Sequence, residues 1–79
     1  MLLTDCRKGD VVEIMDIHDN WAKEQVIRFG IVQGVKVTCV SISTHGPVVI
    51  KKNNQQIALG YQIAKEVKVK RGVGAWGRK

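Results

Sequence analysis

Turn-forming residues divide this chain into short segments, and this division limits the folds that are open to it. Gly9-Asp10, Gly34 and Gly46-Pro47 are turn signals, and Asn53-Asn54 suits a two-residue hairpin turn because asparagine tolerates a positive φ. The apolar runs in between reach about three residues, whereas a membrane span needs roughly 20 and a signal-peptide centre roughly 7–15. A chain of 79 residues is also too small for several parallel crossovers around one core. Short antiparallel strands are therefore the expected building blocks.

The alternation of apolar and polar residues predicts five such strands. Two of them flank Asn53-Asn54 and form a β-hairpin, and a single turn of helix around Gln62–Ala64 precedes the last one. We place the strands at Val11–Ile17, at a segment with Val35, Val37 and Cys39 on one face, at Val48–Lys52, at Gln55–Leu59 and at Val67–Val69.

One helix of about two to three turns is predicted near residues 20–29. The side chains of Asp19-Asn20 can cap its first turn, where free amide groups need acceptors. Ala22, Val26 and Phe29 recur at helical spacing, so they are expected to face the core together. Gly30 stands where a left-handed C-cap would be needed.

Five short strands with one brief helix predict an all-β fold, a small antiparallel five-stranded barrel of the SH3-like type. This domain would occupy residues 1–71. Residues 72–79 are rich in glycine, carry basic residues and Trp76, and are expected to form a flexible tail.

Basic charge is concentrated in the second half of the chain. Residues 1–35 carry six acidic and four basic groups, whereas the remainder carries nine basic groups against Glu66 alone. A basic half can attract nucleic acid, anionic lipid or an acidic protein surface, and the charge count does not choose among them.

The sequence contains no clear catalytic or metal-binding pattern. Cys6, Cys39, His18 and His45 are suitable ligand types, but they do not form the close pairs, such as Cys-x-x-Cys, that zinc sites usually show. We expect both cysteines to be reduced core residues, and no tightly bound metal or cofactor; a transient ferrous contact through His18 or His45 stays open. Neither a phosphate loop nor a nucleophile with its base is recognisable, so we do not expect an enzyme.

Nucleic-acid binding is the main alternative function. Small basic barrels hold single strands by phosphate contacts and by stacking bases on exposed aromatic side chains. Among the aromatic residues, Phe29 is assigned to the core and Trp76 to the tail, which leaves Trp21 and Tyr61 for a stacking platform. The lysines of the second half could still contact phosphates.

The order of these signals resembles the ferrous iron transport protein A (FeoA) family over about residues 2–69. Leu2-Leu3 and Gly9-Asp10 match the family's opening leucine segment and its turn, and Phe29-Gly30-Ile31 matches the end of its helix. Gly60 departs from the family, because relatives often carry arginine there. The remaining matches follow in the family's order: Gly34, Gly46-Pro47, Ile57-Ala58-Leu59, Ala64, Val67 and Val69.

Periodicity and the family pattern together give the expected core. Its members are apolar residues that share the inner face of a strand or of the helix. They are Leu3, Val12, Ile14, Val26, Phe29, Val37, Cys39, Val49, Ile57, Leu59 and Val67.

The resemblance implies a cytoplasmic accessory of the ferrous iron permease that carries a G-protein domain, with no small-molecule substrate. Such a protein would lie at the inner face of the membrane through its partner and support or regulate uptake. The barrel also resembles the carboxy-terminal domain of iron-dependent repressors, so a free-standing relative of that domain is another alternative. Two copies could pair weakly through exposed strand edges. For the docking surface we predict Trp21, Ile31 and the basic pair Lys51-Lys52.

Overall fold

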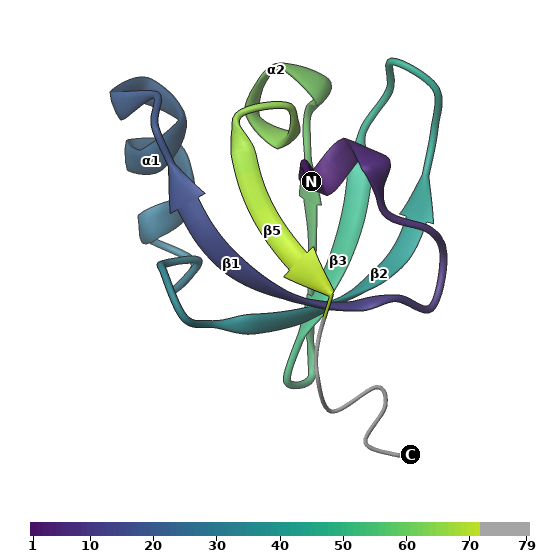
Figure 1. Ribbon diagram of the computed structural model, residues 1–79. Helices are drawn as coiled ribbons and strands as arrows, with labels where there is room; N and C mark the ends of the chain where they lie inside the picture. The colour runs from purple at the N-terminus through teal and green to yellow at the C-terminus, as the bar shows by residue number, and fades with distance from the viewer. Residues whose placement is uncertain (72–79) are drawn as a thin grey trace.

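The computed structural model describes residues 1–71, and Figure 1 shows how their elements are arranged. The predicted tail, residues 72–79, lies outside the described residues. Each predicted strand and helix is present, with boundaries that differ by a few residues at most. In chain order the elements are η1 (Leu3–Asp5), β1 (Val11–Ile17), α1 (Asn20–Ile27), β2 (Lys36–Ile42), β3 (Val48–Lys52), β4 (Gln55–Leu59), α2 (Tyr61–Ala64) and β5 (Val67–Arg71).

The five strands form one antiparallel sheet in the order β4-β3-β2-β1-β5. This sheet is strongly curled, so that β5 crosses in front of β3 in Figure 1, while α1 stands at the end of β1. The predicted antiparallel five-stranded barrel with a short helix is confirmed. Within residues 1–71 no helix is both long enough and apolar enough to cross a membrane.

A bulge in β1 changes which side chains face the core. Ile14 pairs with Val69, but the next pair is Asp16 with Lys68, so Met15 is the extra residue on this strand. The alternation shifts by one position beyond the bulge. Ile17 is consequently buried, whereas the side chain of Asp16 is exposed.

The β3–β4 hairpin forms as predicted, and its register corrects one core assignment. Asn53 adopts a φ of 57°, which the tight turn requires. The turn pairs Ile50 with Ile57, and both side chains are buried, as are those of Val48 and Leu59 in the same alternate set. Val49 lies one position out of phase, on the outer face, where it is half-buried.

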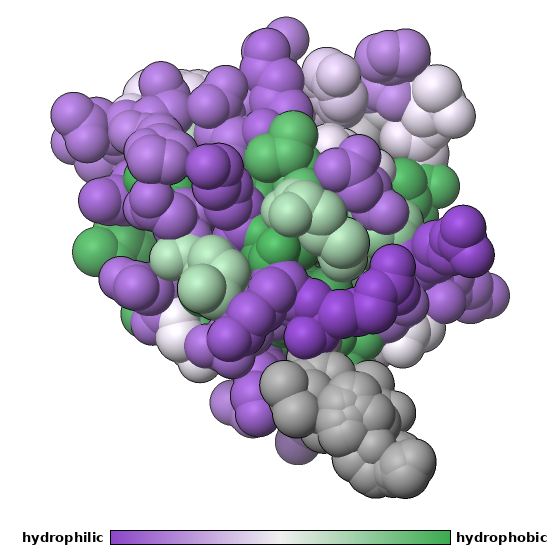
Figure 2. Space-filling view, in the orientation of Figure 1, coloured by the Kyte–Doolittle hydropathy of each residue, from purple (hydrophilic) through white to green (hydrophobic). Residues whose placement is uncertain are grey.

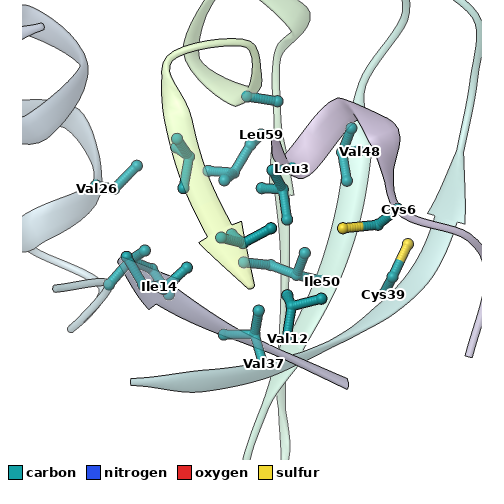
Figure 3. Close-up of a cluster of buried hydrophobic side chains, with 14 of the residues drawn as sticks. Leu3, Cys6, Val12, Ile14, Val26, Val37, Cys39, Val48, Ile50 and Leu59 are labelled. Atoms are coloured by element: carbon teal, nitrogen blue, oxygen red, sulfur yellow. The ribbon is translucent and has the colours of Figure 1, made fainter. Parts of the chain in front are cut away.

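The inner face of the sheet and the facing sides of η1, α1 and α2 enclose one apolar core, part of which Figure 3 shows. Among residues 1–71 no polar or charged residue is buried. Every residue of the predicted core is buried except Val49 and Phe29.

Phe29 is the second correction, because α1 ends at Ile27, before the helical position that would turn Phe29 inward. The amide of Gly30 donates to the Ile27 carbonyl at 2.9 Å, and Gly30 adopts a φ of 76°. The chain then doubles back, and the amide of Ile31 donates to the Val26 carbonyl at 3.2 Å. Ile31 takes the core position and is fully buried, whereas Phe29 is 38% exposed.

Candidate docking site

Exposed apolar side chains gather on α1 and the loop that follows it. Among residues 1–71 the exposed large hydrophobic residues are Met1 and four members of this segment: Trp21, Ile27, Phe29 and Val32. Ile27 and Trp21 are more than half exposed, at 55% and 53%. Hydrophobic side chains at the left edge of Figure 2 lie where Figure 1 places α1 and its loop. Exposed apolar surface of this kind is typical of a protein–protein contact.

A cleft of about 180 Å³ lies beside these residues, and we name it the α1 cleft. Ile17 and Ile31, both buried, lie behind its inner wall, and exposed Ile27 and Val32 provide apolar edges. Polar groups of both charge signs complete its lining. The full set is Asp16, Ile17, Lys23, Ile27, Ile31, Val32 and Gln33.

Local hydrogen bonds hold the helical wall of the α1 cleft in place. The carboxylate of Asp19 accepts from the amide of Ala22 at 2.9 Å, which caps the first turn of α1 as predicted. Ala22 and Val26 are buried against the core. Lys23 and Ile27 are four residues apart, so they share the side of α1 that lines the cleft.

Two of the predicted docking residues, Trp21 and Ile31, lie on this side of the molecule, and they differ in exposure. Trp21 is exposed on the first turn of α1 but does not line the cleft. Ile31 lines the cleft from below and has no accessible surface, so its prediction as a surface contact is corrected to a core role. The turn at Gly30, which brings Ile31 under α1, is the physical reason.

The predicted pair Lys51-Lys52 does not form one basic spot. Consecutive residues of a strand point to opposite faces, and Lys51 is exposed on the outer face of the sheet, across from Thr38 and Gln56. The Lys52 ammonium instead lies 2.8 Å from the position that a Cβ on Gly30 would take. Lys52 alone therefore lies next to the loop that carries Phe29 and Val32.

Sequence reasoning missed Ile27 and Val32 as surface residues. A usable signal was present: Ile27 directly follows core residue Val26, so it must point away from the helix side that Ala22 and Val26 bury. No comparable signal existed for Val32, because its exposure depends on the path of the chain after Gly30.

Both cysteines are core residues, as predicted. They are free thiols, and Figure 3 shows them in the same part of the core. Burial raises the pKa of Cys6 to about 11, with smaller contributions from the Cys39 thiol and the Asp10 carboxylate. Burial likewise raises the pKa of Cys39. Both thiols are therefore protonated at neutral pH, a form that neither attacks electrophiles nor binds metals well.

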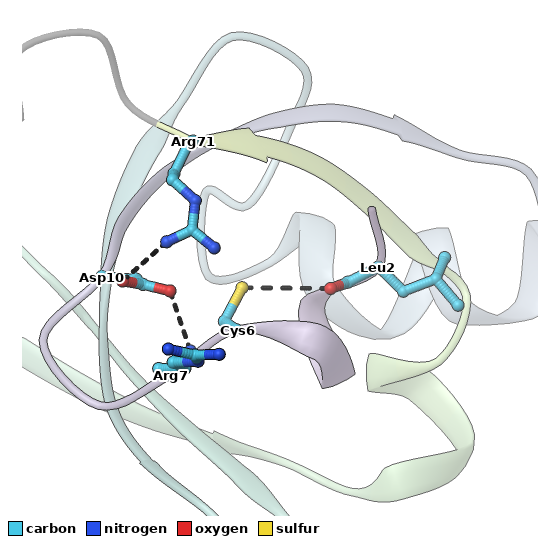
Figure 4. A network of polar contacts seen from close by, with 5 residues as sticks. All are labelled: Leu2, Cys6, Arg7, Asp10 and Arg71. Carbon is cyan, nitrogen blue, oxygen red and sulfur yellow. Dashed lines mark hydrogen bonds and ion pairs between the residues drawn. The ribbon is translucent and has the colours of Figure 1, made fainter.

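A polar network closes the barrel next to Cys6. Asp10 bonds the Arg71 guanidinium at 3.1 Å and accepts from the Arg7 amide at 2.9 Å, as Figure 4 shows. This arrangement ties the end of β5 to the turn that precedes β1. The carboxylate of Asp10 is thus paired through both oxygens, so a structural role accounts for Asp10 and Arg71.

The two histidines lie in different places. His18 contacts Asp16 at 3.1 Å at the surface, and His45 packs edge-on against Tyr61 with ring centroids 5.3 Å apart. His45 also lines a polar hollow of about 290 Å³ together with Asp5. In residues 1–71 no group of three or more His, Cys, Asp or Glu side chains is placed to hold a metal ion. The absence of a bound metal or cofactor stays a prediction.

Comparison with known proteins identifies the family. The family model described as the FeoA domain matches residues 1–71. No curated protein matches the chain. Among solved structures, a crystal structure of an iron uptake regulatory protein, FeoA, superposes with a TM-score of 0.82 at 20% identity, over 91% of this chain and 97% of that one. The solution structure of a FeoA protein from Chlorobium tepidum has a TM-score of 0.76 at 19% identity, over 90% and 70% of the two chains.

Parts of longer proteins contain the same fold, among them the manganese regulator SloR. The crystal structure of T. acidophilum IdeR has a TM-score of 0.82 at 15% identity, over 91% of this chain but 34% of that one. At such identities the likeness shows the shared SH3-like fold alone. The match to the family model covers residues 1–71 of a 79-residue chain, and on that basis this chain belongs to the FeoA domain family.

Proposed function

We propose that this protein is a cytoplasmic accessory of ferrous iron uptake that docks through the α1 cleft on the permease with a G-protein domain. The observation that carries this proposal is the apolar cleft with exposed Ile27 and Val32 at its edges, in a member of the FeoA family. Two relatives support the connection to iron: one is called an iron uptake regulatory protein, and another, from Clostridium thermocellum, iron(II) transport protein A.

Docking would work by inserting an apolar side chain of the partner into the α1 cleft. The cleft holds about 180 Å³, which suits one or two aliphatic or aromatic side chains. Asp16 and Lys23 at its rim would orient the incoming segment by charge. Trp21 would add a contact on the neighbouring side of α1, and Lys52 would steer the approach of an acidic partner surface.

We propose no catalytic role and no small-molecule substrate. The buried thiols are protonated at neutral pH, and the hydroxyls near His45 lie in an open polar hollow with no ordered base–nucleophile hydrogen bond among the described residues. Support or regulation of transport would then act through the partner's conformation.

The nucleic-acid alternative receives less support from the surface. Lys51 and Lys70 lie on the outer face of the sheet, with Glu13 between the strands that carry them. The exposed aromatic residues Trp21 and Phe29 instead lie on α1 and in the loop that follows it. Bases stacked on Trp21 would therefore not be continuous with phosphates held at the outer face. A free-standing relative of the repressor domain stays an alternative on fold alone.

Capture of the permease from membrane extract tests the proposal. Ile27→Ala combined with Val32→Ala should weaken docking by about 1–3 kcal/mol, or roughly five- to 150-fold, because both side chains edge the cleft. Val40→Ala, which shortens a half-buried aliphatic residue on β2 that does not line the cleft, is the control. Equal capture by the double variant and the control would rule out the α1 cleft. Failure of the unaltered protein to capture the permease would contradict the proposed function.

The two lysines provide a second, internally controlled test. Lys52→Ala should slow association with the permease, with little effect on dissociation, since peripheral charges act mainly through steering. Lys51→Ala removes the same charge from the adjacent residue but on the opposite side of β3. Equal effects of both substitutions would show that net charge, and not the position of Lys52, matters.

A further inference from the structure

The outer edge of β4 carries main-chain groups without partners. The two-residue turn makes Lys52 and Gln55 the first hydrogen-bonded pair of the hairpin, and such pairs alternate along an antiparallel ladder. The N–H and C=O groups of Gln56 and Ala58 therefore point away from β3. β4 is the last strand of the sheet, and none of the other main-chain bonds within residues 1–71 involves Gln56 or Ala58.

The opposite edge of the sheet is protected, which makes the β4 edge distinctive. Leu2 forms a bridge with Lys68 on the outer side of β5, and the amide of Val69 donates to the Met1 carbonyl at 2.8 Å. β5 also carries basic side chains along its exposed face. By both means the chain blocks strand addition at β5.

The β4 edge has neither protection. Residues 53–64 contain no Asp, Glu, Lys or Arg, although the whole chain carries a net charge of +6. Gln56 and Ala58 are exposed, and proline is absent from this segment. Charged side chains and proline are the usual means by which edge strands avoid pairing with other chains. A second positively charged copy can approach here without bringing like charges face to face.

We propose that β4 pairs with β4 of a second copy of this chain, antiparallel and centred on Ile57. In this register Gln56 lies opposite Ala58 of the other copy, so the unpaired N–H and C=O groups of both residues bond across a two-fold axis. A register displaced by two residues in one direction places Ala58 opposite Asn54 of the turn. A displacement by two residues in the other direction places Gln56 opposite Gly60, at the start of α2. The two sheets would join into one continuous sheet. This inference goes beyond the proposed function and does not depend on it.

The association should be weak and should respond to salt in a diagnostic way. A contact along one five-residue strand is smaller than the roughly 1,200–2,000 Å² of stable complexes, so the dimer forms at high protein concentration. Because each copy carries a net charge of +6, salt screens their repulsion and strengthens the pairing. Docking that depends on lysines would weaken under the same change.

A register-specific charge exchange tests the proposal with the full chain. Gln56→Lys with Ala58→Lys places lysines directly opposite each other across the interface, and such pairs are destabilising. Gln56→Glu with Ala58→Lys places opposite charges in the same positions and leaves the net charge unchanged. Sedimentation at about 0.05 to about 2 mM protein, a range suited to a weak interface, gives the average mass. We expect concentration-dependent dimers for the unaltered chain, monomers for Lys/Lys and at least equal dimerisation for Glu/Lys.

Glu24→Lys adds the same +2 of charge as Lys/Lys at an exposed position on α1, away from the β4 edge, and it should dimerise like the unaltered chain. Thermal unfolding of all four proteins identifies any variant that fails to fold. A mass that stays monomeric for the unaltered chain at the highest concentration and at high salt would overturn the proposal. So would Lys/Lys dimers equal to those of the control, or a Glu/Lys variant that stays monomeric while folded.

Discussion

Shortening Ile31 should destabilise the fold in proportion to the core volume that is lost. Ile31 has no accessible surface and packs beneath α1. Ile31→Ala should cost about 2–5 kcal/mol, because the cavity cannot fully collapse, whereas Ile31→Val should cost about 0.5–1.5 kcal/mol. A domain of this size has a total stability of about 4–12 kcal/mol, so the alanine variant loses a large share of it. Each 1 kcal/mol lowers the midpoint of thermal unfolding by about 4–8 °C.

Thermal unfolding followed by circular dichroism measures the effect. Val32→Ala is the matched control: Val32 is the next residue and also lines the α1 cleft, but it is 40% exposed, so its loss should change stability by about 0.5 kcal/mol or less. Permease capture well below the unfolding midpoint should be nearly normal for Ile31→Val. An Ile31→Ala variant with an unchanged midpoint and lost capture would refute the core assignment, because it would show Ile31 acting as a surface contact.

Three further predictions concern the N-cap of α1, the glycine in the turn that follows this helix and a buried thiol. Asp19→Ala should lower stability by about 0.5–2 kcal/mol through loss of the N-cap hydrogen bond, whereas Glu24→Ala, at an exposed position of the same helix, should not. Equal midpoints of thermal unfolding for these two variants would contradict the capping role of Asp19. Gly30→Ala should lower the stability of the fold by about 1–2 kcal/mol because Gly30 has a positive φ. Adding Lys52→Ala should restore little of this stability, since the flexible Lys52 ammonium can move away from the new Cβ. Full restoration would show that the clash between the Cβ and Lys52 is the main cost. Because folding raises the pKa of Cys6, this thiol loses its proton at lower pH in the unfolded chain than in the folded one. The free energy of unfolding, measured by urea titration, should therefore fall as pH rises from 9.0 to about 11. An equal fall in a Cys6→Ala variant would assign the loss to other groups.

Local turn chemistry made most of the fold predictable. Asn53-Asn54 fixed the hairpin, and the pattern of glycines fixed the number of strands. The same turn also held the information to place Val49 correctly. A two-residue loop pairs Ile50 with Ile57, and since Ile57 was assigned to the core, Ile50 had to face inward and Val49 outward. That error came from applying strand periodicity without the register.

Other features could not be read from local patterns. The bulge at Met15, which turns Ile17 inward, depends on pairing with β5, whose residues lie about fifty positions further along the chain. The exchange of Phe29 for Ile31 in the core depends on where α1 ends. Both residues are apolar, and helix boundaries are uncertain by a few residues from sequence, so the choice was settled by packing under α1.

Two adjacent charged residues on a strand can be given a common role only once it is known which face of the sheet each one occupies. Lys51-Lys52 was treated as one basic feature because the residues are adjacent in sequence. Side chains of adjacent strand residues point to opposite faces, so the two ammonium groups lie on different surfaces. Lys51 lies on the outer face of the sheet, whereas Lys52 lies next to the loop beside the α1 cleft. A partner that needs both charges must therefore wrap around β3, whereas one that uses the cleft needs Lys52 alone. Lys51→Glu should then leave permease capture nearly unchanged, while Lys52→Glu should reduce it, and an equal loss for both would require a partner that wraps.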